Sequence, residues 1–213
     1  KGLPRLEAGN ARLTINGNTA TFFLPAAVIR AAPGQHLQVQ DARLLVSGVD
    51  QDRPLAHVDA RLAGPAGSVL SLLDRPPLGL LRNTALEGTG FDGKLEARFS
   101  AKSPIHDGLS MRDVHVIEAK ASIVEGNARK VMGRYTISGA AIRAEARDNI
   151  IDVAGEALLE GVLTRLSWRH ALLADPKELQ SLKLRANLGN SERAQLGINL
   201  GEVVSGDVQL DLT

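Results

Sequence analysis

The chain has 213 residues, a net charge of +1, 44% apolar residues and no cysteine. This apolar content excludes a disordered chain, and the lack of cysteine excludes disulfides, thiolate metal sites and cysteine nucleophiles. Aromatic residues make up only 3% and the charges of both signs are interspersed. Sugar-binding and nucleic-acid-binding surfaces, which depend on aromatic platforms or basic patches, are therefore not expected.

The first part of the chain predicts a β-hairpin. Residues 11–15 alternate apolar and polar side chains, residues 16–18 read Asn-Gly-Asn, and residues 19–24 are rich in β-forming residues. Asn-Gly between alternating segments is a strong hairpin signal. Residues 25–32 fit either one helical turn or an extended crossover.

Alternation continues in the next two segments. Leu37 and Val39 are in one phase, and residues 42–46 are in the other, with the slip near Asp41. Such a slip is typical of a β-bulge. Residues 56–62 then alternate again, so we expect two more strands here.

Residues 64–81 form the longest apolar run without strand-like alternation. Helical spacing places several leucines and valines on one face, Ser68 can cap the start, and Pro76-Pro77 must end the helix. We predict one short helix at about residues 66–74, with Leu70 and Leu73 buried on the sheet. Two roles remain open: the helix covers an open end of the sheet, or it closes or gates an apolar groove. The residues expected to form this cover are Val69, Leu70, Leu72 and Leu73.

The rest of the chain is predicted as strands joined by short turns. Asp148-Asn149 and Gly126-Asn127 are expected turns, a slip is expected between Val116 and Ala119, and 175–178 is expected to form a single helical turn. The further strands are expected at residues 94–99, 109–124, 131–138, 140–146, 150–155, 156–168, 181–188, 193–200 and 207–213.

Together these segments predict a mainly β fold, one domain spanning residues 1–213. Strict alternation gives every strand one apolar and one polar face. A sheet with one apolar face must fold over on itself, close into a barrel, or leave a groove that something else fills. Both ends of the chain interrupt the pattern, so we expect a fragment of a longer protein.

No constellation of catalytic or metal-binding residues is recognisable. The histidines at 36, 57, 106, 115 and 170 are scattered, without metal-ligand spacing. No nucleophile elbow or phosphate-binding loop is present, and no helix follows the glycines at 88, 90 and 93. We therefore expect no catalytic residue, no metal and no cofactor, and do not expect an enzyme.

Two passages resemble a known family. Residues 71–105, SLLDRPPLGLLRNTALEGTGFDGKLEARFSAKSPI, and residues 137–168, ISGAAIRAEARDNIIDVAGEALLEGVLTRLSW, are similar to the AsmA-like superfamily, in particular its large periplasmic members of the YhdP and TamB type. In that family a short helical segment precedes a glycine-containing strand and then a strand that ends near a Pro-apolar pair, here Pro104-Ile105.

The resemblance implies an elongated, strongly curved antiparallel sheet, taco-like, with an apolar groove. It further implies a protein anchored in the inner membrane of Gram-negative bacteria through a segment absent here. Such a protein extends through the periplasm and carries phospholipids towards the outer membrane. Its partners would be phospholipid acyl chains and membranes, with other envelope proteins unspecified and no nucleic acid.

The groove is expected to be lined by the apolar members of the alternating pairs. These are Leu13, Ile15, Phe22, Leu37, Val39, Leu95, Ala97, Phe99, Val114, Val116, Ile142, Leu184, Leu196 and Ile198. The alternative is a structural or scaffolding periplasmic β-domain for outer-membrane assembly, with a closed core and no ligand.

Overall fold

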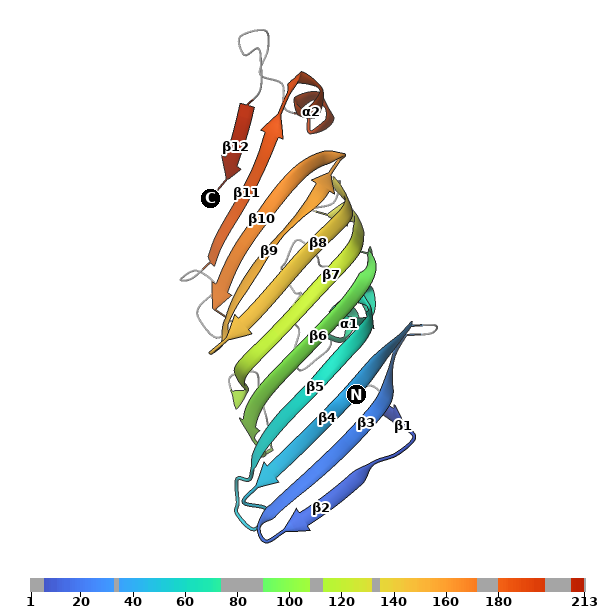
Figure 1. Ribbon diagram of the computed structural model, residues 1–213. Helices are drawn as coiled ribbons and strands as arrows, with labels where there is room; N and C mark the ends of the chain where they lie inside the picture. Colours follow the sequence, from blue (N-terminus) through green and yellow to red (C-terminus); the bar gives the residue numbers. More distant parts are fainter. Residues whose placement is uncertain are drawn as a thin grey trace.

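The computed structural model describes residues 6–32, 35–73, 90–107, 113–131, 135–171, 180–197 and 208–212. They form one 12-stranded antiparallel sheet that does not close into a barrel, with two short helices (Figure 1). The predicted mainly β fold with an elongated, curved antiparallel sheet is confirmed. The strands are β1 (Leu6–Ala8), β2 (Arg12–Asn16), β3 (Thr19–Ala32), β4 (Gln35–Ser47), β5 (Leu55–Pro65), β6 (Gly90–Pro104), β7 (His115–Val131), β8 (Tyr135–Arg147), β9 (Ile150–Leu159), β10 (Val162–Ala171), β11 (Gln180–Leu188) and β12 (Val208–Leu212).

From β3 onward each strand pairs with the next strand in the sequence. Residues 25–32, which fitted either a helical turn or an extended crossover, are part of β3. Both β1 and β2 pair with β3, so they share one edge of it.

Two-residue turns join several of these strands. The predicted hairpin between β2 and β3 is confirmed, with Gly17 at φ 58°. The predicted turn at Asp148-Asn149 joins β8 to β9, and its φ angles of 50° and 63° are those of the type I′ turn that favours tight hairpins. The expected continuous segment at 156–168 is wrong, because Glu160-Gly161 forms a further hairpin turn between β9 and β10.

Bulges keep the apolar side chains on one face of the sheet. Asp41 has φ 50° and lies where the register between β4 and β5 shifts, as the sequence slip predicted. The slip between Val116 and Ala119 likewise coincides with a register shift between β6 and β7. Gly126-Asn127, expected as a turn, instead lies inside β7 next to a bulge at Glu125, which has φ 55°.

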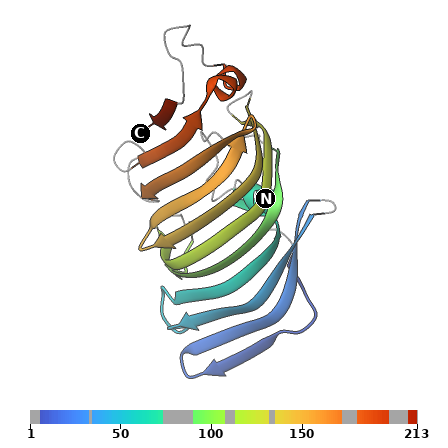
Figure 2. The same ribbon diagram turned by 45° about the horizontal axis from the view of Figure 1, so that its top comes forward.

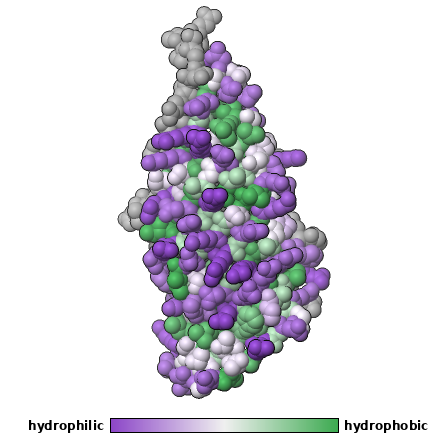
Figure 3. Space-filling model, in the orientation of Figure 1, coloured by the Kyte–Doolittle hydropathy of each residue, from purple (hydrophilic) through white to green (hydrophobic). Residues whose placement is uncertain are grey.

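The register places apolar residues opposite one another across the sheet. One such row, which we call the apolar row, runs from β4 to β11 through Val39, Leu62, Ala97, Ala121, Ala144, Val153, Trp168 and Leu182. The next residue along each of these strands points to the other face. That face carries charged residues over the middle of the sheet (Figure 3).

The predicted helix is present as α1 (Ala66–Leu73) and lies against β6 while approaching β3, β4 and β5. Ala66 and Ser68 are fully buried. Gly67 lets α1 approach β6 closely, because a Cβ there would lie 2.4 Å from the carbonyl oxygen of Phe91. The sheet curves around the side on which α1 lies (Figure 2), so α1 covers part of the apolar face.

A second helix, α2 (Asn190–Gln195), was not expected. The strand predicted at residues 193–200 is therefore wrong at its start, although Ala194, Leu196 and Ile198 alternate with polar residues. Gly189 precedes α2, and the following Ser-Glu-Arg-Ala-Gln contains strong helix formers. The helical turn expected at 175–178 lies outside the described residues.

Candidate functional site

The centre of the apolar face is made of small side chains. Ala97, Ala121 and Ala144 lie opposite one another on β6, β7 and β8, and Ala119 lies opposite Ala146 in the neighbouring row. We call these five residues the alanine floor. Since an alanine side chain is a single methyl group, the floor is lower than the rest of the face.

Larger residues border the alanine floor. Leu95, Ile123 and Ile142 pair with one another in the row on one side of it. Phe99 pairs with Ala119 and occupies the β6 position of the second row. Larger apolar side chains therefore flank the alanine floor on this face.

The apolar row is long enough for a lipid chain. It crosses eight strands, from β4 to β11, and neighbouring strands lie about 4.8 Å apart, so it spans about 34 Å. The hydrocarbon core of a bilayer is about 30 Å thick, so the acyl chains of one leaflet reach about 15 Å. The row is therefore longer than a single acyl chain.

The residues predicted to line the groove differ in exposure. Leu37, Val39 and Leu95 are buried, with 0%, 5% and 4% of their surface exposed. Leu13 and Ile15, both on β2, are 62% and 66% exposed. Phe22 is 36% exposed, and the half-buried members are Ala97, Phe99, Val114, Val116, Ile142, Leu184 and Leu196.

Most of these predicted residues share the apolar face, with three exceptions. Val114 lies just before β7. Leu196 follows α2 rather than lying in a strand, and it packs on the buried cluster of Val162, Ala186 and Leu188. Ile198 lies outside the described residues.

The predicted helix cover is only partly described. Val69, Leu70 and Leu72 are half-buried on α1, and the side chain of Leu73 lies outside the described residues. Both Leu70 and Leu73 were predicted to be buried on the sheet. Leu70 is only half-buried, and for Leu73 the burial stays a prediction.

Sequence reasoning named only Ala97 of the alanine floor and missed the other four residues. Their signal was present, because Ala119 and Ala121, and then Ala144 and Ala146, are the apolar members of alternating segments. The prediction favoured large apolar side chains as groove residues. Small residues opposite one another, however, are what leave space above the sheet. The cross-strand register that aligns them cannot be read from one strand alone.

An aromatic pair also lies on the apolar face, at β10. The Trp168 and His170 rings stack with their centroids 5.4 Å apart and their planes 9° from parallel. Trp168 pairs with Val153 and Leu182, and His170 pairs with Ile151. Nδ1 of His170 is buried and has no hydrogen-bond partner among the described residues.

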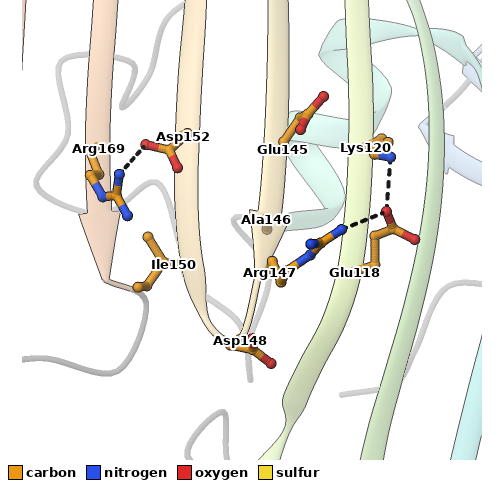
Figure 4. A pocket seen from close by; sticks show the side chains of 9 residues that line it. All are labelled: Glu118, Lys120, Glu145, Ala146, Arg147, Asp148, Ile150, Asp152 and Arg169. Atoms are coloured by element: carbon orange, nitrogen blue, oxygen red, sulfur yellow. Dashed lines mark ion pairs between the residues drawn. The ribbon is translucent and has the colours of Figure 1, made fainter.

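The opposite face carries exposed ion pairs (Figure 4). Nζ of Lys120 lies 2.9 Å from a carboxylate oxygen of Glu118, and Arg169 lies 3.5 Å from Asp152. The hydrogen bond and charge of Lys120 lower the pKa of Glu118, and Glu118 in turn raises the pKa of Lys120. In Figure 4 these side chains and α1 lie on opposite sides of the sheet.

Within the described part of the chain, no group of three or more His, Asp or Glu side chains is placed to hold a metal ion. No described helix has the length and apolar character needed to cross a bilayer. Comparisons of the chain with protein-family models, with curated proteins and with solved structures find no match. The resemblance to the AsmA-like superfamily therefore stays a prediction.

Proposed function

We propose that this protein is a lipid-binding groove segment that moves phospholipids between the inner and outer membranes of a Gram-negative envelope, without catalysis. It acts in the periplasm and is tethered to the inner membrane. The observation that supports this most is the apolar row of an open, curved sheet with the alanine floor at its centre. The resemblance in residues 71–105 points to the same function.

The binding energy comes from the acyl chain. Each methylene that leaves water on the alanine floor contributes about 0.8 kcal/mol, and the small side chains leave room for it. The head group stays in water at the open side of the groove. Because the floor presents similar methyl groups on three successive strands, a chain can shift along it without leaving a deep trap.

The burial pattern favours a groove over a closed core. Two small clusters of buried apolar residues lie at different places in the described part of the sheet, one of Ala27, Val39 and Ala60 and one of Val162, Ala186 and Leu188. Other buried apolar residues, such as Leu95 and Ala146, lie outside both clusters. The alanine floor between them is mostly half-buried. Soluble proteins rarely leave a large continuous apolar surface without a partner, and an acyl chain is a partner of the right shape.

The test fills the groove with a side chain. We expect the organic extract of the purified protein to contain phospholipid by mass spectrometry. Ala121→Trp places a large ring on the alanine floor, and it should lower the lipid content per protein by about tenfold while the protein still folds, because the groove is open on one side.

Ser122→Trp is the matched control, since it is the next residue of β7 and points to the polar face. It should leave the lipid content unchanged. If the parent protein carries no phospholipid, and if Ala121→Trp unfolds the protein as overpacking of a sealed core would, the groove proposal is wrong and the scaffolding function stands.

A further inference from the structure

The polar face contains a row of charged residues, in which like charges are neighbours, and the proposed lipid groove does not use it. Arg61, Arg98 and Lys120 lie directly opposite one another on β5, β6 and β7. The same row continues through Glu145 and Asp152, also opposite one another, to Arg169 on β10. We call these six positions the charged row; its signs are three positive, two negative and one positive.

This arrangement works against the stability of the sheet. Like charges directly opposite on neighbouring strands are destabilising. If Lys120 on β7 and Glu145 on β8 exchanged places, opposite charges would be neighbours from Arg98 to Arg169. Arg61 has Asp41 at 3.3 Å and Lys120 has Glu118 at 2.9 Å. Arg98, at the centre of the three cations, has no ion pair with another described residue.

The three cations also line a depression. Together with Arg143, two glutamines and the carboxylates of Glu96 and Glu145 they border a shallow hollow of about 650 Å³, whose charged lining is four cations and two anions. Successive strands are about 4.8 Å apart, so the cations form a line about 10 Å long. The hollow gives a ligand access to the side of the guanidinium groups.

The carboxylates around this line select the shape of the ligand. Glu96 lies one row to one side, since it pairs with Ser122 and Ala63, and Glu118 lies one row to the other side, since it pairs with Ser100. A flat anionic membrane would meet these carboxylates together with Glu145 and Asp152 and be repelled. A narrow ligand that follows the row reaches Arg98 directly and competes with Asp41 and Glu118 for Arg61 and Lys120.

We propose that the charged row binds an extended acidic segment of a partner protein. The segment carries acidic residues on one face opposite Arg61, Arg98 and Lys120, followed by basic residues opposite Glu145 and Asp152. In an extended peptide, alternate side chains are about 6.8 Å apart, whereas the cations lie on strands about 4.8 Å apart. The long, flexible Arg and Lys side chains can bridge this difference in spacing. This interaction is independent of the lipid groove on the opposite face.

The test uses a peptide of complementary pattern. Fluorescein-labelled Glu-Gly-Glu-Gly-Glu-Gly-Lys-Gly-Lys should bind the parent protein in fluorescence anisotropy at low salt, and the peptide with every charge reversed should not. Arg98→Glu should weaken binding by at least about tenfold. Its melting temperature should be equal to or higher than that of the parent, because the change replaces the middle of three like charges with an opposite one.

Lys183→Glu is the matched control: it makes the same change of charge on the polar face of β11, outside the charged row. It should leave peptide binding unchanged. The proposal is overturned if the parent does not bind the peptide, if both variants weaken binding equally, or if phosphatidylglycerol vesicles or inorganic phosphate bind the charged row in place of the peptide.

Discussion

At the residue scale, the close approach of β8 and β9 depends on a missing side chain. Gly155 lies opposite Ile142 on the apolar face. A Cβ at Gly155 would lie 2.3 Å from the carbonyl oxygen of Ala141 and 2.8 Å from the Cα of Ile142. Both are backbone atoms, which cannot turn away as a flexible side chain does. Glycine inside a strand often marks such a contact.

We therefore expect Gly155→Ala to lower the free energy of unfolding by about 1–3 kcal/mol, the usual cost of overpacking. Urea denaturation followed by circular dichroism measures this. The control is Gly90→Ala in β6, where an added Cβ meets no atom of the described residues within 4 Å. Equal stability of the two variants would contradict this, because it would show that β8 and β9 can move apart without lowering the free energy of unfolding.

At the element scale, α1 is held on the sheet by tight contact at its first turn. The fully buried Ala66 and Ser68 flank Gly67, whose Cα faces the carbonyl oxygen of Phe91. Glycine is a poor helix former, about 1 kcal/mol worse than alanine. Its presence in an eight-residue helix indicates that docking on β6 matters more than helix propensity.

Gly67→Ala separates these two effects. Helix propensity alone predicts a more stable protein, whereas docking predicts a loss of about 1–3 kcal/mol, because the new methyl group pushes α1 away from β6. We expect the loss, measured by chemical denaturation. A gain in stability would mean that α1 moves without cost and does not close this part of the apolar face.

At the scale of the whole molecule, the two faces of the sheet differ in chemical character. The bulges at Asp41 and Glu125 and the slip after Val116 keep the apolar residues in line from strand to strand. The charges therefore stay together on the other face, in water. The curved sheet thus has one apolar face and one charged face.

Three carboxyl groups, two on the sheet and one on α2, predict how the protein responds to acid. The pKa of Glu118 is lowered by Lys120, that of Glu125 by Lys94, and that of Glu192 by the hydroxyl group of Ser191, all from an ordinary value of 4.5. Carboxyl groups with lowered pKa bind fewer protons in the folded chain than in the unfolded chain. Their contribution to the free energy of unfolding is fully present above pH 4.5. It is lost as the pH falls through the pKa that these groups have in the folded protein.

We expect the melting temperature to fall as the pH drops below 4.5. The fall should be smaller in the double variant Glu118→Gln and Glu125→Gln, which removes two of these carboxyl groups. The difference between parent and variant at neutral pH should be modest and should shrink in high salt, because these pairs are exposed to solvent. Scanning calorimetry from pH 7 to about pH 3 measures it, and parallel curves for the two proteins would contradict the expectation.

Alternation and turn chemistry by themselves determined the fold class, most strands, the hairpins at Gly17 and Asp148, the bulge at Asp41 and helix α1, because each depends on a few neighbouring residues. Tertiary structure decided where alternation misleads: Glu160-Gly161 turns the chain, and residues after Gly189 form α2. It also decided which residues meet. The alanine floor and the charged row each take one residue per strand, so they exist only through the register, which bulges in several strands set together.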